Sequence, residues 1–265
     1  MSVPITPSSL TALVARLRAA GCVFAEDEAA LLVAAAASEA ELDALSARRI
    51  AGEPLEHVIG WVEFRGLRVA VEPGVFVPRQ RTAFLVDRAA AVARPGSVVV
   101  DLCCGAGAIG AALADAVPGV ELYAADIDPA AVRCARRNLA GVAAGVFEGD
   151  LFEPLPAGLR GRVDVLVANV PYVPSDEVAL MPPEARDHEP RASLDGGADG
   201  LDVLRRLAAG AGGWLAPGGH LLVEAGERQA PTAVAIMAGH GLRAAVVTAD
   251  DEYATVVVGQ RSTCR

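Results

Sequence analysis

The chain has 265 residues, of which 53% are hydrophobic and 21% charged, and its formal net charge is −10 at pH 7. This composition is typical of a globular protein with a sizeable core, and it excludes an intrinsically disordered one. The acidic balance also argues against a broad surface for binding nucleic-acid phosphates.

The sequence carries no signal for a membrane or an oxidising compartment. The apolar run at 29–37 is far too short to span a bilayer, and residues 1–10 lack the charged and apolar regions of a secretory signal. The five cysteines form no C-x-x-C pair, which favours reduced thiols, and the four histidines have no metal-ligand spacing. We therefore expect a cytoplasmic protein with no metal site.

The first fifty residues are patterned as helices. Leucines recur at helical spacing from Leu10 to Leu17, and the ranges 26–37 and 39–50 continue the pattern. From Val58 to Val71 the hydrophobic period changes to two on either side of a turn, which predicts a β-hairpin.

Beyond residue 97, strand and helix patterns alternate along the chain. We expect strands at 97–102, 120–126, 146–149, 163–168 and 220–224, and helices at 108–116, 129–138, 201–209 and 229–240. Alternation of this kind predicts a mostly parallel sheet with helices on both faces. The final strands, 243–247 and 255–258, have no helix between them, so they should form an antiparallel hairpin at one edge.

A glycine-rich turn follows the first strand of this sheet. The segment Asp101–Gly110 satisfies the G-x-G-x-x-G template, so a dinucleotide-binding fold is a serious competitor. However, a pyrophosphate needs bare backbone N–H groups and no anion beside it. Asp101, Asp126 and Asp150 lie at the ends of three successive strands, and such carboxylates favour a sulfonium cation with a ribose. S-Adenosylmethionine carries that cation and no phosphate.

The predicted cofactor contacts follow from this arrangement. Gly105 and Gly107 would let the backbone approach the cofactor closely, and Asp126 would accept hydrogen bonds from the ribose hydroxyls. Ile127 would pack on the adenine, whose edge Asp150-Leu151 would border. The full predicted set is Asp101, Cys103, Gly105, Gly107, Ile109, Asp126, Ile127, Asp150, Leu151 and Asn169.

The strand at 163–168 ends in Asn169-Val170-Pro171-Tyr172. An Asn at the carboxyl end of a parallel strand, followed by a stiff proline and an aromatic ring, suits a planar amide or amino group. An amide nitrogen is a weak nucleophile, and two acceptors aimed at its N–H bonds would stabilise the charge that develops during attack. We predict that the Asn169 side-chain oxygen and the Val170 carbonyl are these acceptors. Asn and Pro are also common in plain turns, so the motif alone does not decide the function.

From about Gly52 onward, the chain resembles the HemK/PrmC family of protein-(glutamine-N(5)) methyltransferases. The matching segments are Gly52-Glu53-Pro54-Leu55, Ile59-Gly60-Trp61-Val62-Glu63-Phe64, Val77-Pro78-Arg79 with Thr82, the glycine loop, Asn169-Val170-Pro171-Tyr172, Glu189-Pro190, Asp199-Gly200-Leu201-Asp202, Pro217-Gly218-Gly219 and Glu224-Ala225-Gly226 with Gln229. The resemblance implies an α/β fold with a Rossmann-like class I methyltransferase sheet. It also implies a helical substrate-recognition domain at 1–56, a β-hairpin linker at 57–78 and a methyltransferase domain at 79–265.

The resemblance further implies S-adenosylmethionine-dependent methylation of a glutamine side-chain amide nitrogen in a protein. The ancestral substrate it implies is a peptide chain release factor with its Gly-Gly-Gln motif. By the same resemblance Phe76 would wall the substrate pocket, while Asn169, Val170, Pro171 and Tyr172 would bind the substrate and form the catalytic motif. We expect a monomer that acts on a protein partner and has no direct contact with nucleic acid or membrane.

Two departures from the family pattern lie near the expected substrate entrance. Val170 stands where the family has the first proline of Asn-Pro-Pro-Tyr, and Gln80-Arg81 replaces Pro-Glu. Val170 still precedes Pro171, so it is biased towards extended geometry and keeps its carbonyl. These changes leave open a paralogue with a different protein substrate. The sequence is also compatible with an adenine-N6 nucleic-acid methyltransferase and with a cofactor-binding regulator that has lost catalysis.

Overall fold

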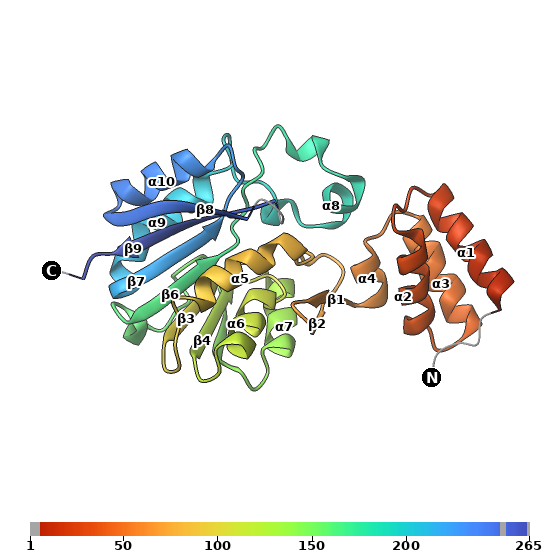
Figure 1. The fold of residues 1–265 in the computed structure, drawn as a ribbon, viewed down its shortest axis with the longest axis horizontal. Helices are drawn as coiled ribbons and strands as arrows, with labels where there is room; N and C mark the ends of the chain where they lie inside the picture. The colour runs from red at the N-terminus through yellow and green to blue at the C-terminus, as the bar shows by residue number, and fades with distance from the viewer. Residues whose placement is uncertain (1–5, 250–252, 264–265) are drawn as a thin grey trace.

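The structure, a computed structural model, describes residues 6–249 and 253–263. Three helices open the described chain and pack on one another at one end of the molecule (Figure 1). They are α1 (Pro7–Ala19), α2 (Ala25–Ala35) and α3 (Glu39–Ile50). Their apolar faces form a small core of their own around Leu17 and Leu32, which are fully buried. The helical pattern predicted for this part of the chain is confirmed.

A short helix and a hairpin join these helices to the rest of the chain. α4 (Leu55–Ile59) ends at Gly60, whose φ of +83° favours glycine. β1 (Trp61–Phe64) then pairs antiparallel with β2 (Leu67–Ala70), as predicted. The period of two does not begin at Val58, however, because that residue lies in α4. This helix has little more than one turn, which is too short for a helical period to show in the sequence.

A seven-stranded sheet forms the larger part of the chain. Its strands are β3 (Val98–Leu102), β4 (Glu121–Asp126), β5 (Ala143–Glu148), β6 (Val163–Ala168), β7 (Leu215–Glu224), β8 (Leu242–Ala249) and β9 (Ala254–Arg261), in the spatial order β5-β4-β3-β6-β7-β9-β8. The first five run parallel, whereas β9 pairs antiparallel with both β7 and β8. The predicted antiparallel hairpin at one edge is confirmed. The strand order reverses at β3, which lies between β4 and β6.

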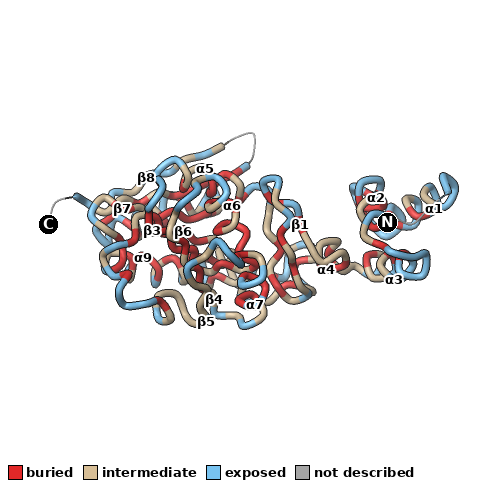
Figure 2. The backbone as a smooth tube through the Cα atoms, turned by 90° about the horizontal axis from the view of Figure 1, so that it is seen from below, coloured by how far each residue is buried: buried red, intermediate tan, exposed pale blue. Residues whose placement is uncertain are grey.

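Five helices cover the two faces of the sheet (Figure 1). α5 (Ala83–Ala90), α6 (Ala108–Ala116) and α7 (Pro129–Asn138) pack on one face, and α9 (Asp202–Trp214) and α10 (Ala230–Gly239) pack on the other. Successive residues of a strand point to opposite faces, so the apolar runs of β3 and β6 contribute side chains to the cores on both faces of the sheet. Figure 2 shows these central strands mostly buried.

Two helices lie in segments for which the sequence predicts no element. α5 follows a 3-10 turn at Gln80–Thr82, and α8 (Pro183–His188) lies in the long loop between β6 and α9. Both helices are short, so their apolar residues do not repeat often enough to establish a helical period. Their positions matter because the segments around them reach the functional site described below.

Helix α9 continues to Trp214, past the predicted end at Ala209. Glycine disfavours a helix interior, and Gly210, Gly212 and Gly213 account for the early end of the predicted helix. Gly210 has a packing reason, because a Cβ there would lie 2.5 Å from the Phe152 ring. That ring stacks on Trp214 with a centroid separation of 5.6 Å. The aromatic contact therefore compensates for the poor helix propensity.

Strands β5 and β7 also begin earlier than predicted. β7 starts at Leu215 and passes through Pro217-Gly218-Gly219, a sequence typical of a turn. The register with β6 shifts between Val163 and Val165, so the turn-like residues form an irregularity within the strand.

Candidate active site

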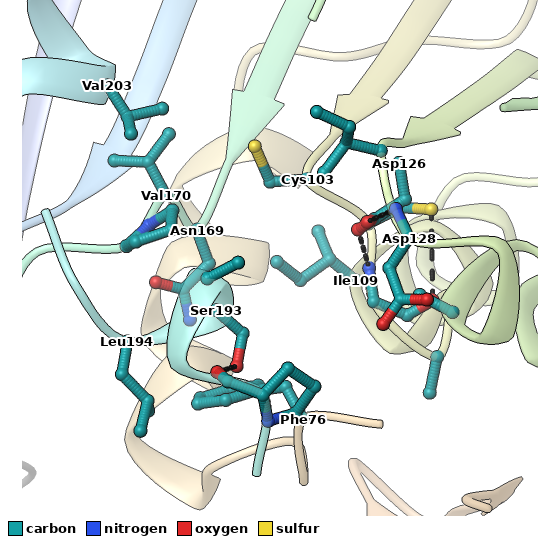
Figure 3. Close-up of a pocket in the computed structure, with 18 of the residues that line it drawn as sticks. Phe76, Cys103, Ile109, Asp126, Asp128, Asn169, Val170, Ser193, Leu194 and Val203 are labelled. Carbon is teal, nitrogen blue, oxygen red and sulfur yellow. Dashed lines mark hydrogen bonds between the residues drawn. The ribbon is translucent and has the colours of Figure 1, made fainter. Parts of the chain in front are cut away.

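A cavity of about 320 Å³ lies at the carboxyl ends of β3, β4 and β6. This is the point where the strand order reverses, and open α/β sheets bind their ligands there. Figure 3 shows Cys103, Ile109 and Asp126 on one side of the cavity and Asn169 and Val170 on the other. The topology thus brings the glycine-rich turn and the Asn-Val-Pro-Tyr motif to one site.

The turn after β3 adopts backbone conformations that most side chains avoid. Cys103, Gly105 and Gly107 have φ values of +55°, +54° and +79°. The Gly107 N–H donates to the Cys104 carbonyl at 2.7 Å, and Gly107 begins α6 as its N-cap. A Cβ on Gly107 would lie 3.1 Å from the Leu139 side chain. The loop therefore turns tightly and leaves Gly105 at the cavity wall.

The Asp126 carboxylate lies at the cavity wall and is held by two backbone N–H groups. Its Oδ2 accepts from Gly105 at 2.8 Å, and its Oδ1 accepts from Asp128 at 2.9 Å. Burial raises the pKa of Asp126, although these backbone hydrogen bonds oppose the rise. Each oxygen keeps a second lone pair for a hydroxyl donor. Ile127 beside it is 61% exposed and lines the same cavity, so a planar ring could cover it.

Two residues of the predicted cofactor-binding set do not reach the cavity wall. Asp101 is fully buried, and its Oδ2 accepts the Gly110 N–H at 2.9 Å. Its Oδ1 has no hydrogen-bond partner among the described residues, and burial raises the pKa of Asp101 to about 7. Gly107 packs against Leu139 instead. Asp101 and Gly107 therefore lie behind the cavity wall, where they shape the loop.

The third carboxylate of the predicted series is paired. Asp150 lines the cavity and forms an ion pair with Arg206 of α9, which lines it as well. Leu151 follows at the wall with a φ of +47°. Asp101 is buried and Asp150 is paired, so fewer unpaired carboxylates face the cavity than the sequence indicates. Within the described residues, the negative charge available to a cationic cofactor comes mainly from Asp126.

The two adjacent cysteines also line the cavity. Burial, reinforced by the nearby carboxylates, raises the pKa of both the Cys103 and the Cys104 thiol. A thiol with a raised pKa stays neutral and is a poor nucleophile at neutral pH. Their surroundings therefore support a packing role, and Ile109 completes the apolar part of this wall.

Asn169, Val170, Pro171 and Tyr172 form the opposite wall of the cavity. The Asn169 Nδ2 donates to the Thr82 hydroxyl at 3.4 Å. Val170 is only 3% exposed and packs in the core on the α9 side of the sheet. The predicted transfer motif consequently shares a cavity with the glycine loop and Asp126.

A polar cluster behind this wall holds the Tyr172 hydroxyl. The hydroxyl donates to Glu224 Oε1 at 3.0 Å and accepts from Arg81 Nη2 at 2.5 Å. Burial and the Glu224 carboxylate raise the pKa of Tyr172 to about 12. Arg81 Nε donates to the same Glu224 oxygen at 3.1 Å. Arg81, one of the two departures from the family pattern, is thus bonded within the cluster.

Phe76 lines the cavity from the segment after the hairpin, as the resemblance implies (Figure 3). The Arg79 guanidinium lies 4.8 Å from the centre of its ring and donates to both Glu189 oxygens at 2.7 Å. Glu189 also accepts the Val77 N–H at 3.1 Å. Burial raises the pKa of Glu189, and the nearby Arg79 opposes the rise. Glu189 therefore fixes the segment that carries Phe76.

Several wall residues were not among the predicted site residues. They include Phe64, Arg81, Thr82, Met181, Ser193, Leu194, Val203 and Arg206. Phe64 and Thr82 lie in segments that carry the family resemblance, which is the one signal that could have singled them out. Met181, Ser193 and Leu194 lie outside α8 in the long segment between β6 and α9, where no hydrophobic period marks a side chain as facing a cavity.

Comparison with known proteins agrees with this geometry. Residues 66–181 match the methyltransferase small domain family. The release factor glutamine methyltransferase of Geobacter sulfurreducens is 39% identical over 219 residues, which cover 82% of this chain and 76% of the relative. The same enzyme of Bradyrhizobium diazoefficiens is 36% identical over 259 residues, with 87% and 86% covered.

The chain belongs to the release factor glutamine methyltransferase family. It is a methyltransferase, and its methyl donor is S-adenosylmethionine. A further relative, from Streptomyces pristinaespiralis, is 37% identical over 201 residues (73% of this chain and 68% of the relative) and is named 4-amino-L-phenylalanine/4-methylamino-L-phenylalanine methyltransferase.

Solved structures agree on the fold of this family member. A methyltransferase from Pyrococcus furiosus superposes with a TM-score of 0.57 at 16% identity and covers 75% of this chain and 90% of its own. A ribosomal protein L11 methylase from Lactobacillus delbrueckii subsp. bulgaricus gives a TM-score of 0.52 at 17% identity, with 73% and 85% covered. The predicted Rossmann-like class I methyltransferase sheet is confirmed.

Across residues 6–249 and 253–263, no helix combines the length and apolar character needed to cross a membrane. In the same part of the chain, no three His, Cys, Asp or Glu side chains are placed to share a metal ion.

Proposed function

We propose that this methyltransferase modifies the side-chain amide nitrogen of a glutamine in a protein, and that the protein is a peptide chain release factor with a Gly-Gly-Gln motif. The observation that carries the proposal is the position of Asn169. Its amide donates to Thr82 on one side, so its carbonyl oxygen remains as an acceptor, in the same cavity as Asp126 and the glycine loop. The names of the relatives support the substrate.

The chain's own residues fit S-adenosylmethionine. Asp126 offers free lone pairs to the ribose hydroxyls, and the exposed Ile127 offers an apolar face to the adenine. Cys103, Gly105, Ile109, Asp150-Leu151 and Asn169 complete the set that we propose around the cofactor. When bound, S-adenosylmethionine supplies an electrophilic methyl group attached to a sulfonium.

The transfer motif acts on the acceptor nitrogen. An amide lone pair is delocalised into its carbonyl, so the nitrogen is a weak nucleophile. It gains positive charge as its lone pair forms the bond to the methyl carbon, and it then releases one N–H proton to solvent, while the electron pair of the broken methyl–sulfur bond would stay with the sulfur. Acceptors placed against the two N–H bonds stabilise that charge, and we propose Asn169 Oδ1 and the Val170 carbonyl for this task. Pro171 stiffens the turn, while Tyr172 and Phe76 form walls that hold the planar amide for in-line attack.

The helices before the sheet are the part of the molecule that we propose for substrate recognition. The proposed division is a helical domain at 1–56, a hairpin linker at 57–78 and a methyltransferase domain at 79–265. Helices α1 to α3 have a core separate from the two cores of the sheet, which supports this division. We further propose a cytoplasmic monomer that makes no direct contact with nucleic acid.

A methyl-incorporation assay that compares substrate classes tests the proposal. The purified chain would be given labelled S-adenosylmethionine with a release-factor domain, the same domain with alanine in place of the Gly-Gly-Gln glutamine, 4-amino-L-phenylalanine, or an adenine-containing DNA duplex. We expect label in the first substrate and in none of the other three. Labelling of the alanine domain, the arylamine or the DNA in preference would overturn the proposed substrate, and no transfer to any of them would favour the non-catalytic regulator.

A further inference from the structure

We infer that Glu224, acting through Thr82, is a positioning residue that fixes which way the Asn169 side-chain amide faces. The inference rests on the proposed function, because the orientation matters only if Asn169 must accept a hydrogen bond from the substrate.

The direction begins at Glu224, which is 3% exposed and lies at the end of β7. Its Oε1 accepts from the Arg81 Nε at 3.1 Å and from the Tyr172 hydroxyl at 3.0 Å. Its Oε2 accepts from the Thr82 hydroxyl at 2.6 Å. A carboxylate paired with a guanidinium can only accept hydrogen bonds, so the three bonds all run towards Glu224.

The hydrogen bond from Thr82 to Glu224 determines which atom of the Asn169 amide can face Thr82. A hydroxyl has one hydrogen, and the hydrogen of Thr82 is used in the bond to Glu224. Towards Asn169 the hydroxyl presents only lone pairs, so it can face the Nδ2 of that amide but not its Oδ1. The observed contact is from Nδ2 to the hydroxyl oxygen at 3.4 Å. Thr82 is 3% exposed, so water has little access to replace the contact.

The outcome is a fixed acceptor in the cavity. With Nδ2 turned to Thr82, the Asn169 Oδ1 remains for an N–H bond of the substrate amide. In the opposite orientation Oδ1 would face the lone pairs of Thr82, and Nδ2 would meet the N–H groups of the substrate. Two donors would then oppose each other, and the stabilisation of the developing charge would be lost.

A matched pair of Thr82 variants tests the first step. Thr82→Ser keeps the hydroxyl, whereas Thr82→Val keeps the shape and removes it. We expect Thr82→Val to lower kcat by about tenfold or more, with the KM for the release-factor domain and the affinity for S-adenosylhomocysteine within about threefold of wild type. Thr82→Ser should stay within about threefold in kcat. Equal kcat values for the two variants would overturn the inference.

Reversing the direction of the bonds gives the sharper test. In Asn169→Asp, a carboxylate oxygen faces the Thr82 hydroxyl oxygen, whose only hydrogen is bonded to Glu224. Two acceptors then oppose each other, so we expect kcat to fall by about a hundredfold. In Glu224→Gln, the side-chain oxygen can still accept from Arg81 and Tyr172, but its Nε2 now donates to Thr82. The Thr82 hydrogen then points at residue 169 and favours the wrong orientation of Asn169, so this variant should also lose activity.

In the double variant Asn169→Asp/Glu224→Gln, each hydrogen-bond donor again faces an acceptor. The Gln at 224 donates to Thr82, Thr82 donates to the Asp at 169, and the other carboxylate oxygen faces the cavity as an acceptor. We expect the double variant Asn169→Asp/Glu224→Gln to be about tenfold more active than Asn169→Asp alone. A purely structural role for Glu224 predicts additive losses instead.

The possible failures are distinguishable from one another. Double and single variants would be checked for unfolding midpoint and for S-adenosylhomocysteine affinity, so that a misfolded protein is recognised. If wild type labels no glutamine, the proposed function fails. If wild type is active and the folded double variant is no better than Asn169→Asp, then the positioning role of Glu224 is overturned while the proposed function stands.

Discussion

Asp126 is the carboxylate on which the cofactor assignment depends most. Replacement by alanine removes acceptors for the ribose hydroxyls and also releases the Gly105 and Asp128 N–H groups. Asp126→Ala should weaken S-adenosylhomocysteine binding by about 1–3 kcal/mol, the scale of charge-assisted hydrogen bonds. Isothermal titration calorimetry measures this change. An unaltered affinity, or preferential binding of NAD by wild type, would contradict the assignment.

Val170 is the departure from the family motif at the centre of the site. It is buried, precedes Pro171, and within the described chain its N–H donates no hydrogen bond to another backbone group. Proline at this position loses no bond, restricts φ and reduces the freedom of the unfolded loop. Val170→Pro should therefore keep or raise methyl transfer to the native substrate.

Turnover of wild type and Val170→Pro on the same release-factor domain measures that effect. A loss of turnover with unchanged S-adenosylhomocysteine affinity would mean that the pocket has been rebuilt around valine. The substrate would then differ from that of relatives with two prolines.

Asp101 makes the stability of the protein depend on pH. Its pKa is raised to about 7 in the folded chain, against about 3.9 in an unfolded one. Between these values the unfolded state releases a proton that the folded state keeps, so this group lowers the free energy of unfolding as pH rises from about 4 to about 7. Above the pKa that Asp101 has in the folded chain, its effect on the free energy of unfolding no longer changes with pH.

Asp101→Asn removes the titrating group and can keep the acceptor for the Gly110 N–H. The free energy of unfolding of the variant, relative to that of wild type, should rise by about 2 kcal/mol from pH 5 to pH 7. Urea unfolding at both pH values provides the measurement. A difference that does not change with pH would show that Asp101 is ionised throughout this range.

At the scale of elements, Arg49 connects helices that are distant in the sequence. The guanidinium of this α3 residue pairs with Glu28 of α2 at 2.6 Å and with Glu184 of α8 at 2.7 Å, and its side chain is 6% exposed. It also donates to the Glu53 carbonyl at 3.1 Å. Arg49 thus links the N-terminal helices to the loop that contributes Met181 to the cavity.

Arg49→Met should be strongly destabilising, by about 3–5 kcal/mol, because it leaves the buried Glu28 without its partner. Adding Glu28→Gln should recover much of that loss, since the uncompensated charge is then absent. Chemical denaturation of the three proteins measures both effects. If the single variant is as stable as wild type, Arg49 has no structural role in this junction.

The predictability of the elements depends on their length and packing. Helices at 108–116 and 129–138 and the strand at 163–168 are predicted with their observed bounds, because each is long enough for its hydrophobic period to show. In contrast, α4, α5 and α8 are too short. The predicted helix at 201–209 ends before α9 does, because Gly210 disfavours a helix. The reason for Gly210 is the Phe152 ring, which stacks on Trp214, and the sequence does not show such a tertiary contact.

At the scale of the whole molecule, the site was predictable where it follows from strand ends. Asp126 and Asn169 each lie at the carboxyl end of an apolar run, and parallel topology brings such ends together. Asp101 has a similar sequence signature but is buried, because it lies inside β3, one residue before the strand ends, and its carboxylate accepts the Gly110 N–H of α6. The contact between Thr82 and Glu224 joins two segments far apart in the chain, and no local period could reveal it.

Catalysis as proposed depends on Asn169, which accepts a hydrogen bond in this cavity from the glutamine amide that is methylated. The most direct measurement is tandem mass spectrometry of a release-factor domain after reaction with wild type or with Asn169→Ala, at equal occupancy by S-adenosylmethionine. We expect one methyl group on the side-chain nitrogen of the Gly-Gly-Gln glutamine with wild type, and a rate lower by about a hundredfold with the variant. A methyl group on another residue, or an undiminished rate with Asn169→Ala, would contradict it.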